Sequence, residues 1–184
     1  ILLFGCKEKE ANKELIDIKT SEYHIYCEES DLKKVFENYR ENNYIPITIK
    51  NKKNQRNALM RIRGDSSRDY EKKSLKVKIS DSLSINTKMI LNFNAEYSDL
   101  SFLRSFLASK IFKKMNYPCF STSFSKIYIN NKYHGLFLEI ENMDKQFLKN
   151  NGLNPSGALF KATKDGACLY SLKELESKWE KKTN

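Results

Sequence analysis

The sequence has few residues of the types that bind metals or build disulfide frameworks. Its two histidines, His24 and His134, have no cysteine or carboxylate at the spacing of metal ligands. Its cysteines show no CxxC spacing, which argues against a zinc or redox motif. The four cysteines are Cys6, Cys27, Cys119 and Cys168. We therefore expect no metal site, and we expect buried free thiols rather than a disulfide scaffold.

Long hydrophobic runs are also missing, and the apolar run at the start of the chain is far too short to span a bilayer. The residues Leu3-Phe4-Gly5-Cys6 resemble a bacterial lipobox, in which the cysteine receives a lipid. We predict that residues 1–6 are a truncated signal peptide with lipidation at Cys6, that 7–20 form a linker and that 21–184 form the domain. The protein would then be an exported lipoprotein of a bacterial cell envelope, periplasmic or surface-exposed. The alternative is an ordinary apolar N-terminus with a chance cysteine.

Positive charge is abundant. The 33 Lys and Arg residues outnumber the 23 Asp and Glu residues, so the formal net charge is +10. This balance suits an anionic partner, such as a nucleotide, nucleic acid, anionic lipid or acidic protein. The lysines are scattered through every predicted element, which favours a solvated basic surface over a contiguous nucleic-acid stripe. We therefore expect no nucleic-acid partner.

Hydrophobic periodicity predicts an α+β fold, an antiparallel sheet packed by one main helix and flanked by short helices. The main helix opens at Ser98-Asp99 and carries one apolar stripe, and Asn130-Asn131 joins the strands of a hairpin over 124–141. The stripe consists of Leu100, Leu103, Leu107 and Ile111. The other predicted helices cover 32–39, 143–152 and 171–179, the other strands cover 44–51, 59–63, 74–79 and 158–162, and 51–57 is a polar turn.

The stretch "MRIRGDSSRDYEKKSLKVKI", residues 60–79, places two alternating strands around a turn rich in Gly, Asp and Ser. In the second strand Lys73 shares a face with Leu75 and Val77, which predicts an inward ammonium, costly to bury without an anion. Lys73 snorkelling from a frayed strand end is the alternative. Turn amides, serine hydroxyls and arginines suit phosphate oxygens, although Gly-Asp-Ser is also ordinary turn chemistry.

Several motifs in this order resemble the spore coat protein H (CotH) kinase family, over about Tyr44 to Tyr170. They are "RIRGDSSRDYEKKSLKVKI", "DLSFLRSFLASKIFKKM", "SKIYINNKYHGLFLEIENMDKQFL" and "GALFKA". The resemblance implies an atypical protein kinase that transfers the ATP γ-phosphoryl group to Ser or Thr of a protein, with a sheet like a kinase N-lobe. Lys73 would be the catalytic strand lysine that pairs the phosphates. Further ATP-binding residues would be Arg63, Gly64, Ser66, Ser67 and Lys76 around the turn, with Glu139 and Glu141 near an adenine-binding hinge at 139–142. For both glutamates a strand-edge ion pair is the alternative.

The departures from the family pattern limit this prediction. Phosphoryl transfer needs Mg²⁺ held by carboxylates, and the family's "WDxD"-type segment does not occur before Asn184. Asp144 and Asp165 are better interpreted as a helix start and a turn residue. We therefore predict the N-terminal, ATP-binding part of an exported kinase, inactive alone, whose Mg²⁺ ligands are not in this chain. The alternative is a non-catalytic, lipid-tethered binding domain that uses a basic face for acidic partners.

Overall fold

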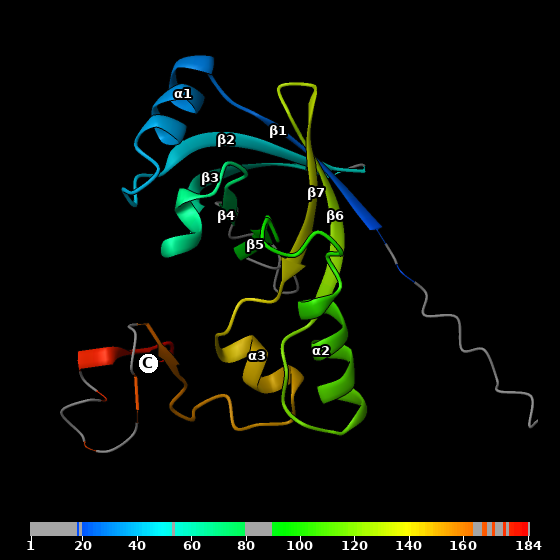
Figure 1. The fold of residues 1–184 in the computed structure, drawn as a ribbon, viewed down its shortest axis with the longest axis vertical. Coiled ribbons are helices and arrows are strands. Elements are labelled where there is room, and N and C mark those ends of the chain that lie inside the picture. The colour runs from blue at the N-terminus through cyan, green and yellow to red at the C-terminus, as the bar shows by residue number, and fades with distance from the viewer. Residues whose placement is uncertain are drawn as a thin grey trace, which may run out of the picture.

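Seven strands close into a barrel in the computed structural model, which describes residues 18, 20–52, 54–79, 90–163, 167–168, 171, 175 and 177–183 (Figure 1). Around the barrel the strands follow the order β1-β2-β3-β4-β5-β7-β6. The parallel pairing of β1 with β6 closes it, whereas the other neighbours are antiparallel. The strands are β1 (Thr20–Tyr26), β2 (Ile45–Asn51), β3 (Asn54–Arg63), β4 (Ser74–Ile79), β5 (Ile90–Asn94), β6 (Thr122–Ile129) and β7 (Lys132–Ile140).

The core lies inside the barrel because each strand alternates apolar and polar residues. On β3 and β4, Ile62 and Leu75 face each other inside and are fully buried, while Arg61 and Lys76 face each other outside. The same alternation on the other strands adds a continuous apolar interior. Its fully buried large side chains include Phe93, Phe137, Ile25, Met60 and Ile127. Burial of this surface is the main stabilising contribution to the fold.

Three helices and a small second sheet lie around the barrel. Helix α1 (Glu29–Glu37) packs Val35 against the core, whereas α2 (Arg104–Lys114) and α3 (Lys145–Asn150) lie at the other end of the molecule (Figure 1). A short 3-10 turn, Ser66–Asp69, follows β3. Strands β8 (Phe160–Ala162) and β9 (Trp179–Lys181) form a separate two-stranded sheet. Within the described residues no helix is long and apolar enough to cross a membrane.

The predicted fold class, α+β with an antiparallel sheet like a kinase N-lobe, is wrong. The molecule is mostly β, and its sheet is a closed mixed barrel rather than an antiparallel sheet packed by one helix. Two strands of the barrel, β1 and β5, were missing from the prediction, as was β9, which lies at the end of the helix predicted at 171–179. Strand β1 supplies the parallel pairing that closes the barrel, and β5 joins β4 to β7. Without these two strands, the pattern of the remaining strands predicts an open sheet.

The main helix was also oriented wrongly. Its predicted stripe is exposed, with Leu100 94 % and Ile111 57 % accessible, while Phe106 and Ser109 are buried. The helix begins at Arg104 rather than near Ser98, because the chain first turns at Asp99, whose carboxylate accepts hydrogen bonds from the amides of Ser101 and Arg104. Phe106 instead packs against Phe124 of β6.

Several local predictions are confirmed. The hairpin turns at Asn130 and Asn131, both with positive φ, and α3 begins after Asp144, whose side chain accepts hydrogen bonds from the amides of Gln146 and Phe147. The polar turn predicted at 51–57 is shorter than expected, because β3 already begins at Asn54. Cys27 and Cys119 are free thiols, and they and Cys168 are only half-buried. Residues 1–17 and Asp165 lie outside the described residues, as does much of the helix predicted at 171–179, so the lipobox and most of the linker do too.

Candidate anion-binding site

The loop between β3 and β4 folds back on itself and depends on a glycine. Gly64 has φ +115°, a conformation that L side chains rarely adopt, and an added Cβ would stand 2.2 Å from Ser67 Oγ. Ser67 is the second residue of the tight turn that begins at Ser66, and Asp65 precedes that turn. The backbone is therefore held close to the Ser67 side chain in a way that another residue at position 64 would disturb.

Arg68 anchors this loop to the segment after α1. Its guanidinium donates hydrogen bonds to the carbonyls of Gly64 and Arg40, both at 2.7 Å, and to Asn42 Oδ1 at 2.7 Å. The side chain is only 8 % exposed. We expected the turn from Arg63 to Arg68 to lie over phosphates, but the Arg68 end of the turn binds backbone carbonyls.

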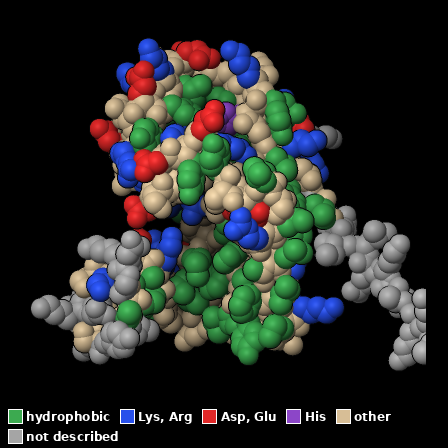
Figure 2. Space-filling model, in the orientation of Figure 1, with side chains coloured by type: hydrophobic (Ala, Val, Ile, Leu, Met, Phe, Trp, Pro, Cys, Tyr) green, Lys and Arg blue, Asp and Glu red, His purple; other side chains and the backbone are tan. Residues whose placement is uncertain are grey.

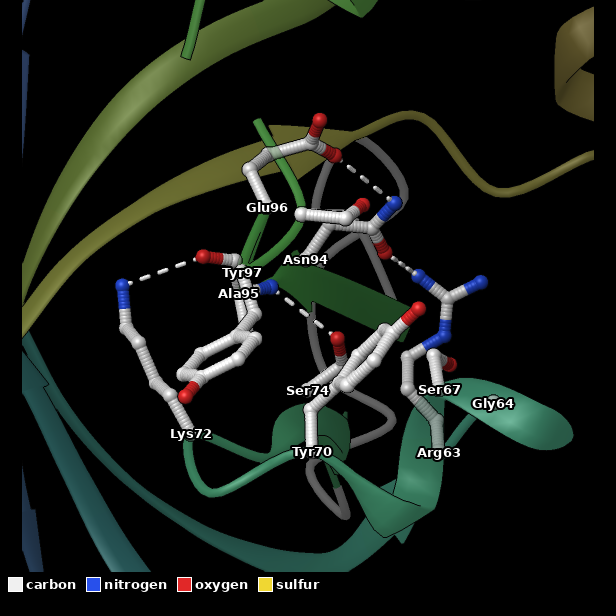
Figure 3. Close-up of a pocket in the computed structure, with 11 residues that line it drawn as sticks. Arg63, Gly64, Ser67, Tyr70, Lys72, Ser74, Asn94, Ala95, Glu96 and Tyr97 are labelled. Atoms are coloured by element: carbon white, nitrogen blue, oxygen red, sulfur yellow. Dashed lines mark hydrogen bonds between the residues drawn. The ribbon is translucent and has the colours of Figure 1, made fainter. Parts of the chain in front are cut away.

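A pocket of about 240 Å³ opens between this loop and the end of β5 (Figure 3). A chain of hydrogen bonds crosses it. Arg63 donates to Asn94 Oδ1, Asn94 donates to Glu96 Oε1 at 3.3 Å, and Ser105 of α2 donates to Glu96 Oε2 at 3.2 Å. We call it the loop pocket; it is lined by Arg63, Gly64, Ser67, Tyr70, Lys72, Ser74, Asn94, Ala95, Glu96, Tyr97 and Ser98. Charged and hydroxyl groups from β3, β4 and the loop after β5 thus meet at one place.

The ammonium groups of the two neighbouring lysines of the loop have different positions and different hydrogen-bond partners. Lys72 lines the loop pocket and donates hydrogen bonds to the carbonyls of Ala95, at 3.1 Å, and Leu136. Lys73 donates to the carbonyls of Arg68 and Tyr70, both at 2.6 Å, with its ammonium over the Tyr39 ring. The inward position predicted for Lys73 is therefore occupied by Lys72. The reason is that β4 begins at Ser74, so the strand alternation does not extend back to residue 73.

Burial lowers the pKa values of the two cations in the pocket. It lowers the pKa of Lys72 to about 8, against the opposing attraction of Glu96, and lowers the pKa of Arg63 to about 10. Arg63 stays charged at neutral pH, and Lys72 loses its proton only above pH 8. Both side chains are thus cations near pH 7, at a cost in desolvation that an anion would offset.

A group of cations that includes Arg63 lies on the outside of the barrel, toward the β8–β9 sheet. We call it the cationic face; it consists of Arg61, Arg63, Lys76, Lys161 and Lys182. Burial is the main cause that lowers the pKa values of Lys76 and Lys161, and the positive charges of Lys182 and Arg63 lower both further. At Lys76 the Tyr44 side chain opposes this change, with a smaller effect than burial. Glu180 contributes a carboxylate to which Lys182 is ion-paired. Figure 2 shows Lys and Arg side chains beside the hollow between the barrel and the small sheet.

Glu139 is inside the barrel rather than at an exposed hinge. It is 3 % exposed, and its Oε2 accepts hydrogen bonds from Tyr23, at 3.2 Å, and Ser125, at 3.1 Å. Burial and the Glu139 charge raise the pKa of Tyr23. Glu141 is outside, where its carboxylate accepts hydrogen bonds from the Ser121 amide at 2.9 Å and from Asn150 at 2.5 Å. Glu139 is therefore in the barrel interior, whereas Glu141 lies beyond the end of β7, next to α3.

The structure brings together four of the predicted site residues. Arg63, Gly64 and Ser67 line the loop pocket, and Lys76 lies with Arg63 on the cationic face. Ser66 is exposed outside the pocket lining, and Lys73, Glu139 and Glu141 lie elsewhere. Sequence reasoning missed Lys72, Lys161 and Lys182. Lys161 was visible in the "GALFKA" motif, but nothing in the sequence pattern indicated that its charge interacts with that of Arg63.

The site does not fit a resident magnesium ion. Mg²⁺ requires oxygen ligands, usually one or two carboxylates with further oxygens. Glu96 is held by Asn94 and Ser105, and Glu180 is ion-paired to Lys182. In the part of the chain that the structure describes, no group of three His, Cys, Asp or Glu side chains could hold a metal ion. The described side chains around the loop pocket and beside Arg63 are therefore mainly cationic.

The domain is thus a closed β-barrel that has a cationic outer face and a loop dependent on Gly64. The model of the family described as CotH kinase protein matches residues 60–184, and the chain belongs to this family. The chain is similar to the inner spore coat protein H of Bacillus subtilis (strain 168), with 25 % identity over 154 residues. The match covers 84 % of this chain and 42 % of the relative, so the chain spans about two-fifths of that protein's length.

Proposed function

We propose that this chain is the nucleotide-binding part of an exported CotH-like protein kinase, and that it binds the phosphates of ATP on the cationic face. The observation that carries the proposal is the arrangement of Arg63, Lys76 and Lys161. Their positive charges repel one another, and burial disfavours the charged forms of all three. A polyphosphate removes both costs at once, because its oxygens accept charge-assisted hydrogen bonds from guanidinium and ammonium groups.

The loop pocket suits one phosphate group better than a whole nucleotide. Its volume of about 240 Å³ is below the range of roughly 300–1,000 Å³ typical of sites for larger ligands. Arg63 borders both the pocket and the cationic face. We infer that the polyphosphate lies on the face and that one end reaches the pocket past Arg63.

On the outer side of β5, Asn92 lies next to Lys76, but only 4 % of it is exposed and its Nδ2 already donates to the carbonyl of Ile140. Asn92 pairs with Lys76 across the β4–β5 ladder, and its Nδ2 also donates to Asn142 Oδ1 at 3.3 Å. We propose that this side, rather than Glu139, faces the nucleoside. Glu139 is in the barrel interior and is engaged by Tyr23 and Ser125.

The proposal for this chain is binding, and we derive no phosphoryl-transfer step. Transfer to a protein Ser or Thr would need Mg²⁺, whose ligands the described residues do not supply. We keep the prediction that the 184-residue chain binds ATP without transferring its γ-phosphoryl group. ATP bound with its own Mg²⁺ still presents phosphate oxygens to the cationic face.

Export is also part of the proposal. The similar protein of Bacillus subtilis is named as an inner spore coat protein, and residues 3–6 resemble a lipobox. We propose that this chain is exported and is attached to a bacterial envelope membrane through a lipid at Cys6. Growth of the producing cells with radiolabelled palmitate tests this, because wild type should incorporate label and Cys6→Ser should not.

Calorimetric titration with three ligands tests the binding proposal. ATP and tripolyphosphate should both bind, more weakly as salt rises, whereas adenosine should bind poorly because it lacks the charged groups. Lys161→Met should lower the affinity for both anions several-fold, and the matched variant Lys126→Met, on the exposed surface of β6, should not. Absence of ATP binding, or adenosine binding as tightly as ATP, would contradict the proposal.

A further inference from the structure

Helix α2 and the residues directly before and after it expose a ridge of large apolar side chains. Their exposed fractions range from 39 % to 94 %, and Figure 2 shows apolar side chains gathered at the end of the molecule where α2 lies. We call this the α2 ridge; it consists of Leu100, Leu103, Leu107, Ile111, Phe112, Met115 and Tyr117. Surface apolar residues are common singly, but a contiguous row of this kind marks an interaction surface.

The charged side chains between Leu100 and Pro118 are all positive, and the acidic residue Glu141 lines the same hollow as Lys113 and Tyr117. Lys110, Lys113 and Lys114 lie on α2, and the sequence from Leu100 to Pro118 contains no Asp or Glu. Arg104 at the start of the helix is ion-paired with Asp99, at 3.4 Å. The apolar ridge is therefore accompanied by lysines that lack acidic neighbours within that segment. Apolar and basic residues together are the composition of helices that lie in the interface of anionic membranes.

The chain enters the barrel on the same side as α2. Thr20, the first residue of β1, pairs with Phe124 of β6, and the Phe124 ring lies 5.0 Å from that of Phe106 on α2. The chain makes fourteen residue steps from Cys6 to Thr20. Fully extended, they span at most about 50 Å. A lipid attached at Cys6 would therefore hold α2 within reach of the membrane surface.

We propose that the α2 ridge inserts into the surface of an anionic lipid bilayer. Leu107, Ile111 and Phe112 would enter the boundary between headgroups and acyl chains, while the lysines bind anionic headgroups. A second copy of the chain fits less well, because two such ridges would bring lysines together, and the segment from Leu100 to Pro118 offers them no acidic partners. This contact adds to the lipid anchor proposed at Cys6, but it does not require that anchor.

Co-sedimentation of the full, non-lipidated chain with vesicles tests the inference. Vesicles of equal parts phosphatidylglycerol and phosphatidylcholine should bind the protein, and vesicles of phosphatidylcholine alone should bind it much less. Ile111→Glu should weaken binding about tenfold or more, because it places a charge among the inserted side chains. Lys114→Gln should weaken it about fivefold, the expected effect of one cation near an anionic surface.

Matched variants separate the ridge from the general positive charge. Tyr133→Glu replaces a side chain 58 % exposed, comparable with Ile111 at 57 %, and Lys132→Gln removes one charge at the β6–β7 turn. Both should bind vesicles like wild type. The apolar residues at the start of the chain are shared by all variants, so they do not affect the comparison.

Three outcomes would overturn the proposal: no binding to anionic vesicles, equal binding by Ile111→Glu and Tyr133→Glu, or self-association that Ile111→Glu abolishes without any vesicle binding. Because this test uses no nucleotide, its failure is distinguishable from failure of ATP binding. Thermal unfolding of each variant verifies that it is folded.

Discussion

Charged side chains have different partners inside the barrel and on its outer surface. Inside, the Glu139 carboxylate accepts hydrogen bonds from Tyr23 and Ser125, so a buried charge is matched by donors. Outside, Arg63 and Lys76 lie together with Lys161 and repel one another. A satisfied buried group contributes to a unique fold. Like charges held together lower stability through their repulsion, which Glu180 opposes at Lys161, and in our proposal a bound anion relieves it.

Removing the interior carboxylate is expected to have the largest effect on stability. Glu139→Ala leaves the buried hydroxyls of Tyr23 and Ser125 without their acceptor and opens a cavity, so the free energy of unfolding should fall by about 3 kcal/mol. Urea denaturation measures this change. ATP affinity of the folded variant should stay near the wild-type value. A stable Glu139→Ala protein that has lost ATP binding would instead favour the hinge role first predicted for Glu139.

A smaller effect is expected in the loop that connects the two regions. Gly64→Ala should lower the free energy of unfolding by about 1–2 kcal/mol, because its φ of +115° is unfavourable for alanine and the new Cβ meets Ser67 Oγ. Gly152→Ala is the matched control, since its φ is +68° but nothing lies within 4 Å of an added Cβ. An equal loss in both variants would show that backbone strain alone matters, and that contact with Ser67 does not.

The smallest effect concerns the pH dependence of Lys72. Its pKa is about 8 in the folded protein, below its ordinary value of 10.5, so the unfolded chain binds more protons between these values. The stabilisation is therefore present above pH 10.5 and is lost as pH falls through 8. From pH 7.5 to pH 9.5 Lys72 should add about 1 kcal/mol to the free energy of unfolding, after allowance for its partial exposure.

Lys72→Met isolates this contribution. Urea denaturation at the two pH values should show a smaller rise in stability for the variant than for wild type. Lys73→Met serves as the control, because the Lys73 ammonium is on the other side of the loop over Tyr39. Identical pH profiles for Lys72→Met and wild type would contradict the assignment.

Short-range pattern predicted much of the local structure. Alternation over residues 74–79 identified β4 with its correct ends and placed Lys76 and Leu75 on opposite faces of the sheet. Turn chemistry at Asn130 and Asn131 identified the hairpin, and the family motif singled out Gly64 and Ser67. These features depend on neighbours within a few residues, which sequence reasoning can evaluate.

The features that were missed depend on distant contacts. Closure of the barrel requires β1 to pair with β6, about a hundred residues later, and no periodicity reports such a pairing. The stripe on α2 was correctly recognised as apolar, yet the helix buries Phe106 instead. Lys73 was assigned the inward position because the strand period was extended one residue beyond its start at Ser74. Whether an apolar or cationic residue faces the core or a ligand is decided by the surrounding elements.

Comparing Lys76→Met with Lys73→Met by ATP titration tests the central claim most directly. Both variants remove one lysine from the same segment, but only Lys76 belongs to the cationic face. We predict that Lys76→Met weakens ATP binding by roughly ten- to a hundredfold, the effect of losing a charged hydrogen-bond partner, and that Lys73→Met changes it less than about twofold. If Lys73→Met abolished binding and Lys76→Met bound like wild type, the cationic face would not be the ATP site.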